Sequence, residues 1–362
     1  MTVTVLSFFA GLLLLVLGAE LLIRGATRLA GALGVSPLVI GLTVVAFGTS
    51  SPELAVSIDA AWSGQGSIAI GNVVGSNIFN VLFILGLAAA IVPLAVAQQL
   101  VRLDVPLMIG LSVVVWLMAR DAELTRLDGI LLVVALLAYT AFVVRQSRRE
   151  QAAVREQYAA EFGQAARSPG RWPANAAIAV AGLVLLVAGS RLLVESATAF
   201  AAWLGVSEVI IGLTIVAAGT SLPEVVTSVL AALRGERDIA VGNVVGSNLF
   251  NLMGVLGIAT AVAPGGISVP ASVIAFDLPV MAAVAFACLP IFVTGVIGRV
   301  EGCLLLGYYL AYTLFLVLAA VDHDRIDEFG EVLLYFVVPI AAITLFALVL
   351  RKGRRRPGSP PG

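Results

Sequence analysis

The stretch GLTVVAFGTSSPELAVS at residues 41–57 decides the fold, because it returns as GLTIVAAGTSLPEVVTS at residues 212–228. Each copy carries one glutamate, Glu53 in the first and Glu224 in the second, inside an otherwise apolar segment. One acid at the same position of two apolar copies indicates a cation site.

A second motif repeats at the same interval, since GNVVGSNIFN at residues 71–80 recurs as GNVVGSNLFN at residues 242–251. Both motifs are displaced by 171 residues, which is 224 − 53 and also 242 − 71. Aligned without a gap, residues 41–81 and 212–252 are identical at 25 of 41 positions. The duplicated unit is therefore a half-protein and not a short motif.

The composition is that of a membrane protein with several spans. Hydrophobic residues make up 60% of the chain, charged residues 12%, and the mean hydropathy is +1.07. A soluble protein of 362 residues needs more polar surface than this. We therefore expect the protein to lie in a lipid bilayer and to bind no nucleic acid.

Apolar runs long enough to cross about 30 Å of hydrocarbon predict eleven spans. They fall at about residues 4–23, 35–61, 67–94, 104–119, 127–145, 174–194, 206–232, 239–264, 272–297, 300–320 and 332–350. With the N-terminus outside, 17 of the 21 Lys and Arg residues lie on the cytoplasmic side. We expect a multi-pass protein of the cell's inner (plasma) membrane, with a cytoplasmic C-terminus.

The only long polar segment divides the chain into halves. The expected parts are a first half at 1–146 with its repeat at about 33–82, a cytoplasmic linker at 147–173, a second half at 174–320 with its repeat at about 204–253, and a final part at 321–362 with an outer acidic loop, an extra helix and a basic tail.

Five predicted spans separate Glu53 from Glu224, and an odd number reverses the direction of the chain. The sequence therefore predicts an all-α polytopic fold of two inverted five-helix repeats, a core of ten helices, and an eleventh C-terminal helix. Inverted repeats are typical of transporters that work by alternating access.

The GTSxPE segment of each copy predicts a broken helix, because its proline removes a helical N–H and clashes with a preceding carbonyl. Main-chain carbonyls near Ala46 and Thr49, and near Ala217 and Thr220, are expected to be freed and to face inward. They would lie at the C-terminal end of a half-helix, whose partial negative charge favours a cation.

Glu53 and Glu224 supply the charge of the predicted site. A carboxylate at the bilayer centre costs about 2.5 to 3.5 kcal/mol on insertion scales, and no basic residue is predicted at that depth. A bound cation or protons must compensate. Oxygen ligands suit sodium, calcium or magnesium, whereas the single His323 in a predicted outer loop and the absence of paired Cys argue against zinc, copper or iron. The alternative is a pair of protonated glutamates that pack helices together.

A polar side chain at every fourth residue forms a stripe on each GNVVGSN helix. The stripes are Asn72, Ser76 and Asn80 in the first copy and Asn243, Ser247 and Asn251 in the second. We expect the serine and the last asparagine of each stripe to be cation ligands. The first asparagine of each is expected to hold helices together by hydrogen bonds.

Together, the paired GTSxPE and GNVVGSNxFN segments resemble the two alpha-repeats of the sodium/calcium exchanger family, within the calcium:cation antiporter superfamily. The resemblance implies a ten-helix fold with a line of cation sites between the four repeat-bearing helices. It also implies ligand roles for the carboxylates of Glu53 and Glu224, for hydroxyl or carbonyl oxygens of Thr49, Ser50, Thr220 and Ser221, for the carbonyls of Ala46 and Ala217, and for Ser76, Ser247, Asn80 and Asn251.

By this resemblance the chain is an antiporter that exchanges calcium for sodium by alternating access, and is neither an enzyme nor dependent on a cofactor. The potassium-dependent branch of the family resembles this chain but places an aspartate where Asn251 stands. The missing negative charge argues against potassium coupling. The calcium/proton branch usually has an acid soon after its GN motif, whereas both copies here read GNVVGSN, which favours sodium. A calcium/proton antiporter and a passive cation channel are the alternatives.

Two aspartates at predicted span starts, Asp104 and Asp277, each have a proline two residues later. This pattern predicts that their side chains cap helix N-termini.

Overall fold

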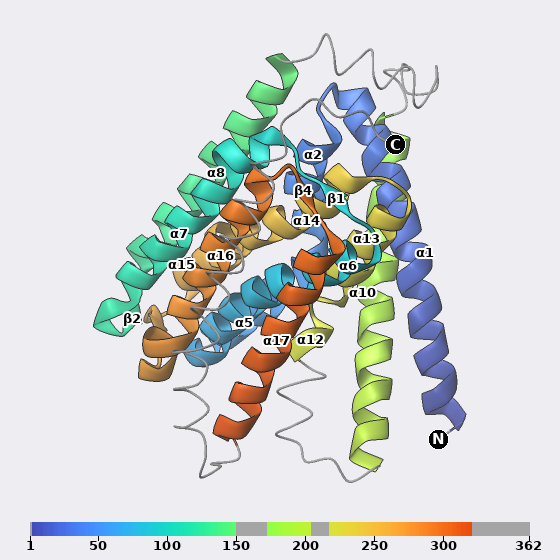
Figure 1. The fold of residues 1–362 in the computed structure, drawn as a ribbon. Coiled ribbons are helices and arrows are strands. Elements are labelled where there is room, and N and C mark those ends of the chain that lie inside the picture. The colour runs from blue at the N-terminus through green and yellow to red at the C-terminus, as the bar shows by residue number, and fades with distance from the viewer. Residues whose placement is uncertain (1, 150–171, 204–216, 321–362) are drawn as a thin grey trace.

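A computed structural model describes residues 2–149, 172–203 and 217–320, and over these residues the chain is helical apart from four two-residue strands (Figure 1). In the first half the elements are α1 (Thr2–Leu33), α2 (Pro37–Ile40), α3 (Ala46–Thr49), α4 (Ser51–Trp62), α5 (Gly66–Phe79), α6 (Gly86–Ile91), β1 (Leu94–Ala95), α7 (Val105–Met118), β2 (Glu123–Leu124) and α8 (Arg126–Arg149). In the second half they are α10 (Trp172–Trp203), α12 (Ala217–Gly219), α13 (Leu222–Leu233), α14 (Arg237–Phe250), α15 (Leu256–Val262), β3 (Ile267–Ser268), α16 (Leu278–Val293), β4 (Val296–Ile297) and α17 (Arg299–Ala320).

Short π-helical segments link several of these helices. They are Gly41–Val45, Asn80–Leu85, Leu100–Asp104, Asn251–Val255 and Val273–Asp277. A 3₁₀ turn at Ala119–Asp121 follows α7. Two π-helical segments of the first half, Asn80–Leu85 and Leu100–Asp104, thus have counterparts in the second half at Asn251–Val255 and Val273–Asp277.

Seven helices of the described residues are long and apolar enough to cross a membrane, or eight if the bent pair α2–α3 and α4 is one span. Three further predicted spans correspond to α13, α17 and residues 332–350. The last of these lies outside the described residues, so the predicted eleventh span is not tested. The all-helical polytopic fold is confirmed.

The two longest helices, α1 and α10, lie side by side (Figure 1) and pack backbone against backbone. A Cβ atom on Gly11 would lie 2.8 Å from the Gly189 carbonyl oxygen, and one on Gly18 would lie 2.8 Å from that of Gly182. Because the contact moves toward the start of α10 as it moves along α1, the two helices run antiparallel.

The strands tie together connections from different halves. β1, after α6, pairs antiparallel with β4, before α17. β2, before α8, pairs antiparallel with β3, after α15. The fourth long helices of the two halves are α7 and α16. In each strand pair, the connection that enters one of these two helices lies beside the connection that leaves the other.

The helices that carry the repeated motifs form the centre of the molecule. In the span Arg237–Val262, 89% of the most apolar window is buried, and in Gly66–Ile91 72% is buried, against 22–39% in the other five candidate spans. The helices that carry the repeated GNVVGSN motif thus lie in the protein interior, and the other helices surround them.

Asp104 and Asp277 are not side-chain caps, which corrects the prediction. Asp104 is fully buried, accepts a hydrogen bond of 2.9 Å from Tyr139 Oη and receives a second from Gln99. Asp277 accepts the equivalent bond, also 2.9 Å, from Tyr312. Each carboxylate therefore joins the start of the fourth helix of its half to the fifth.

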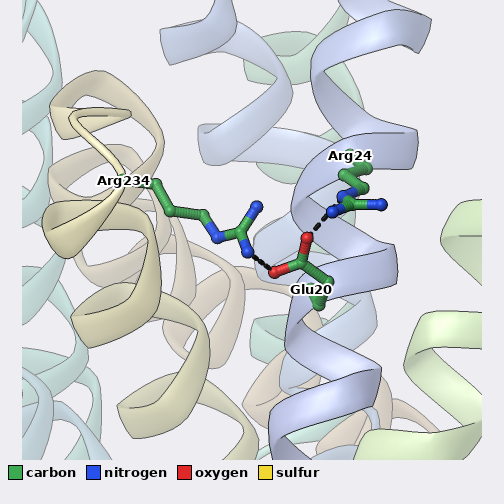
Figure 2. A network of polar contacts seen from close by, with 3 residues as sticks. All are labelled: Glu20, Arg24 and Arg234. Carbon is green, nitrogen blue, oxygen red and sulfur yellow. Dashed lines mark ion pairs between the residues drawn. The ribbon is translucent and has the colours of Figure 1, made fainter.

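One ion-pair network connects α1 to the end of α13 (Figure 2). Glu20 forms ion pairs with Arg24, one turn further along α1, and with Arg234, which directly follows α13. A shift of 171 residues puts Arg191 at the position of Glu20 and Ser63 at that of Arg234, and these two cannot form an ion pair. The equivalent tie, from α10 to the end of α4, is therefore missing.

The close contact of α1 and α10 makes a testable prediction about two glycines. In Gly182→Ala the new Cβ would lie 2.4 Å from Leu22 N, so the helices must separate, and we expect a loss of about 1 to 3 kcal/mol of stability. Gly307→Ala in α17 is the matched control, since nothing lies within 4 Å of its Cβ position. There we expect no loss, because alanine is the better helix former. Thermal unfolding of the purified variants measures both, and equal melting temperatures would contradict the α1–α10 contact.

Candidate functional site

The GTSxPE motif breaks the helix in both copies, as predicted. In the first copy α3 ends at Thr49 and α4 begins at Ser51, with the axes of the flanking segments bent by 48°. Ser50, at the break, has φ −81° and ψ 10°, which are not helical values. Ser221 has φ −88° and ψ 7° at the equivalent break before α13. The local geometry of the two copies is therefore the same.

The two predicted acids each lie in the first turn after a break, and each is only 1% exposed. Ser50 Oγ donates to Glu224 Oε1 at 2.8 Å. Ser221 Oγ donates to Glu53 Oε1, also at 2.8 Å. Each carboxylate is therefore held by the hydroxyl of the other copy, and the two copies build a single site.

The second oxygen of each carboxylate is left open. Glu53 Oε2 and Glu224 Oε2 are buried and accept no hydrogen bond. Neither acid of the site forms an ion pair with a basic residue of the described ranges. A buried carboxylate oxygen without a partner is costly, and a cation is the group that would satisfy it.

Asn72 and Asn243 tie the GNVVGSN helices to the half-helices that carry the acids, as predicted. Each amide donates to the main-chain carbonyl of the glutamate and to a serine one turn later: Asn72 to Glu53 O at 3.2 Å and Ser57 Oγ at 2.9 Å, and Asn243 to Glu224 O at 3.5 Å and Ser228 Oγ at 2.9 Å. These bonds fix where each acid enters the site.

The carbonyl of Ala46 is not free, which corrects one detail of the prediction. It accepts from Ser50 N at 3.0 Å and lies 3.4 Å from Thr49 Oγ1. The hydroxyl of Thr49 also donates across the site to Asn243 Oδ1 at 3.1 Å. A carbonyl oxygen has two lone pairs, so the Ala46 carbonyl can still contribute one to a cation.

The ends of the polar stripes add neutral oxygens. Ser247 Oγ and both amide atoms of Asn251 are buried with no hydrogen-bond partner, as is Asn80 Oδ1. Ser76 is buried on the same stripe as Asn80. π-helical segments begin at Asn80 and at Asn251, and such widened turns are frequent at functional sites.

Most of the predicted ligands are thus gathered in the buried centre. Ten of them are at least 95% buried: Ala46, Thr49, Ser50, Glu53, Ser76, Asn80, Ser221, Glu224, Ser247 and Asn251. Thr220 is half-buried at the second break, and Ala217 begins α12. Across the described ranges no three His, Cys, Asp or Glu side chains cluster, so only two charges supply the site.

Two further asparagines in the centre were missed by sequence reasoning. Asn77 Nδ2 donates to Asn248 O at 3.4 Å, and Asn248 Nδ2 donates to Asn77 O at 3.2 Å. Both are 2% exposed. The available signal was their identity at the 171-residue spacing, next to the serine of each stripe.

The chain matches the family model described as sodium/calcium exchanger protein over residues 3–145 and 174–318. It is 39% identical to CaxA of Alkalimonas amylolytica over 318 residues, which covers 86% of this chain and 98% of that protein. It is 37% identical to the inner membrane protein YrbG of Escherichia coli strain K12 over 307 residues, covering 83% and 93% of the two chains. The sodium/calcium exchanger MaX1 of Methanosarcina acetivorans is 34% identical over 347 residues, covering 87% and 99%.

Solved structures of the sodium-calcium exchanger NCX_Mj have the same fold. In crystals soaked with 10 mM Na⁺ and no Ca²⁺, that protein superposes with a TM-score of 0.72 and 27% sequence identity, covering 90% of this chain and 100% of its own. The two matched ranges of the family model coincide with the two halves that the repeats define. The protein therefore belongs to the sodium/calcium exchanger family, as a multi-pass membrane transporter and not an enzyme.

Proposed function

We propose that this protein exchanges calcium for sodium across the membrane by alternating access at one site that Glu53 and Glu224 share. The observation that carries the proposal is the reciprocal pair of bonds from Ser50 to Glu224 and from Ser221 to Glu53. This pair leaves one unpartnered oxygen on each buried acid. Two such oxygens, one on each of two equivalent half-helices, suit a cation held between the copies.

The charge and the donor atoms favour calcium and sodium as cargo. Two carboxylates balance one divalent ion or two monovalent ions, so the two cargoes compete for the same charges. Carboxylate, hydroxyl, amide and carbonyl oxygens are the ligands that hard cations prefer. The proposed ligands are Glu53, Glu224, Thr49, Ser50, Thr220, Ser221, Ala46, Ala217, Ser76, Ser247, Asn80 and Asn251.

Sodium is the proposed driving ion, because both copies read GNVVGSN without a following acid and because MaX1 and NCX_Mj are named sodium/calcium exchangers. Asn251 in place of an aspartate argues against potassium coupling. A calcium/proton antiporter is the second candidate, since two buried carboxylates without a basic partner can also be neutralised by protons.

The proposed architecture is two inverted five-helix halves at 1–146 and 174–320, joined by the linker 147–173 and followed by an eleventh span within 321–362. The antiparallel packing of α1 with α10 and the pairing of β1 with β4 support the inversion. We place the N-terminus outside and the C-terminus in the cytoplasm on the distribution of Lys and Arg. The proposed inner membrane location rests on the similarity to the inner membrane protein YrbG.

Calcium uptake into proteoliposomes loaded with sodium tests the function. We expect uptake when the outside medium lacks sodium, and loss of this uptake to the background level in Glu53→Ala and Glu224→Ala, because each removes a charge that no other residue of the described site replaces. Glu195→Gln, which changes an exposed glutamate of α10, is the control and should transport normally.

The same vesicles separate the alternatives. Uptake driven by an imposed pH gradient and indifferent to sodium would replace the sodium proposal by the proton antiporter. Calcium flux that follows its own gradient, with no dependence on either counter-ion, would indicate a channel and overturn exchange altogether.

A second prediction concerns the crossed hydrogen bonds. Ser50→Ala removes the donor to Glu224 Oε1, and a bond to a charged group contributes about 1.5 to 3 kcal/mol. We expect the calcium concentration at half-maximal uptake to rise by about 10-fold or more. Ser51→Ala is the matched control, because the neighbouring Ser51 Oγ bonds to Phe47 O, four residues earlier in the chain, and to neither glutamate. An equal effect of the two substitutions would contradict the role of Ser50.

A further inference from the structure

The two GNVVGSN helices are joined where α5 meets α14 by a reciprocal pair of amides. Asn77 donates to the main-chain carbonyl of Asn248, and Asn248 donates to that of Asn77. A methionine sulfur lies beyond each amide: Met281 Sδ is 3.7 Å from Asn77 Nδ2, and Met108 Sδ is 3.5 Å from Asn248 Nδ2. As far as the donors are concerned, the two residues are equivalent.

The acceptor atoms of the same two side chains are used differently. Asn248 Oδ1 accepts a bond of 3.0 Å from Asn80 Nδ2, whereas Asn77 Oδ1 has no partner. In agreement with this, Asn80 has its amide nitrogen engaged and its oxygen open, while both amide atoms of Asn251 are without a partner. The internal symmetry is thus broken at one hydrogen bond, beside the proposed cation site.

We infer that Asn248 is a positioning residue for cation binding, because it holds the Asn80 amide with its oxygen toward the proposed site. The inference rests on the proposed function, and it adds a residue outside the proposed ligand set. Asn248 contacts no cargo in this role. It acts only through the orientation of Asn80.

The physical reason lies in the chemistry of a primary amide. One end of the group is an acceptor and the other carries two N–H donors, and the two ends have nearly the same shape. A cation is bound by the oxygen and repelled by the N–H groups. A donor bond from Asn80 Nδ2 to a fixed acceptor therefore selects the orientation that binds, and this selection is made before the cation arrives.

Asn248 itself is well fixed for this purpose. It is 2% exposed, and its own amide nitrogen is engaged by the carbonyl of Asn77 on the facing helix. Rotation of the Asn248 amide would place its N–H groups against those of Asn80. The bond between helices therefore determines which atom of Asn248 faces Asn80, and so which atom of Asn80 faces the site.

The test compares Asn248→Ala with Asn77→Ala in the full-length protein, with calcium binding and sodium-driven calcium uptake as the measurements. Both substitutions remove one amide bond between the same two helices and create the same loss of volume. Only Asn248→Ala also releases Asn80. We expect the dissociation constant of calcium to rise by about 2- to 10-fold in Asn248→Ala, as for loss of one neutral hydrogen bond, and to change by less than about 2-fold in Asn77→Ala.

A double-mutant cycle with Asn80→Ala distinguishes positioning from packing. If Asn248 acts through Asn80, Asn248→Ala has no further effect on calcium affinity in the Asn80→Ala background. A purely structural role would instead lower the affinity by the same factor in both backgrounds. Thermal unfolding without calcium shows whether the two single variants are equally folded.

Equal loss of calcium affinity in Asn77→Ala and Asn248→Ala, or full additivity in the cycle, would overturn the inference. If Asn248→Ala does not fold, Asn248→Leu, which has nearly the shape of asparagine but no acceptor for Asn80 Nδ2, is compared with Asn77→Leu under the same expectations. Failure of the proposed function has a different signature, since the unmodified protein would then show no sodium-driven calcium uptake. The inference fails alone when the unmodified protein exchanges normally and the two asparagines behave alike.

Discussion

The rest of the structure depends on the burial of two carboxylates that have no basic partner among the described residues. Glu53 and Glu224 are each 1% exposed, and each receives one hydrogen bond from a serine of the other repeat. An isolated buried charge of this kind would cost several kcal/mol. The break in each helix, the asparagine that holds each glutamate backbone and the polar stripe beside it all serve to place oxygen atoms around that charge. The remaining helices exclude water and lipid from it.

The duplication explains why one site needs two copies of one motif. Because the donor for each acid comes from the other repeat, neither half can complete the arrangement alone. In the proposed inverted arrangement, the two copies would also give the site an equivalent approach from each side, which the proposed exchange requires. Symmetry fails at specific positions. Glu20 pairs with Arg234, whereas the equivalent positions hold Arg191 and Ser63, and Asn80 is oriented by a partner while Asn251 is not.

The local features of the site could be read from the sequence, because their causes are local. A proline removes one helical N–H whatever surrounds it, and an acid repeated in an apolar segment needs compensation. The features that sequence reasoning missed depend on partners far away in the chain. Asp104 and Tyr139 are 35 residues apart, and nothing in the Asp-x-Pro pattern distinguishes a helix cap from a buried acceptor. Asn77 and Asn248 meet across 171 residues. The carbonyl of Ala46 was expected to be free, but it accepts the ordinary helical bond from Ser50 N, because the N–H that Pro52 lacks would have bonded to Gly48 and not to Ala46.

The number of charges in the site also determines how exchange responds to voltage. The described acids of the site carry two negative charges, and its remaining proposed ligands are neutral. With both acids ionised, one calcium ion or two sodium ions would leave the loaded site uncharged, and the proposed exchange would then reorient both loaded forms at similar electrostatic cost. A third sodium ion would have to be held by neutral oxygens such as those of Asn80 and Asn251, and would carry one net positive charge with it. That movement would be worth about 2.3 kcal/mol per 100 mV of membrane potential. An aspartate at either asparagine would cancel this charge, so the neutral amide at these positions is what would allow the membrane potential to drive calcium transport.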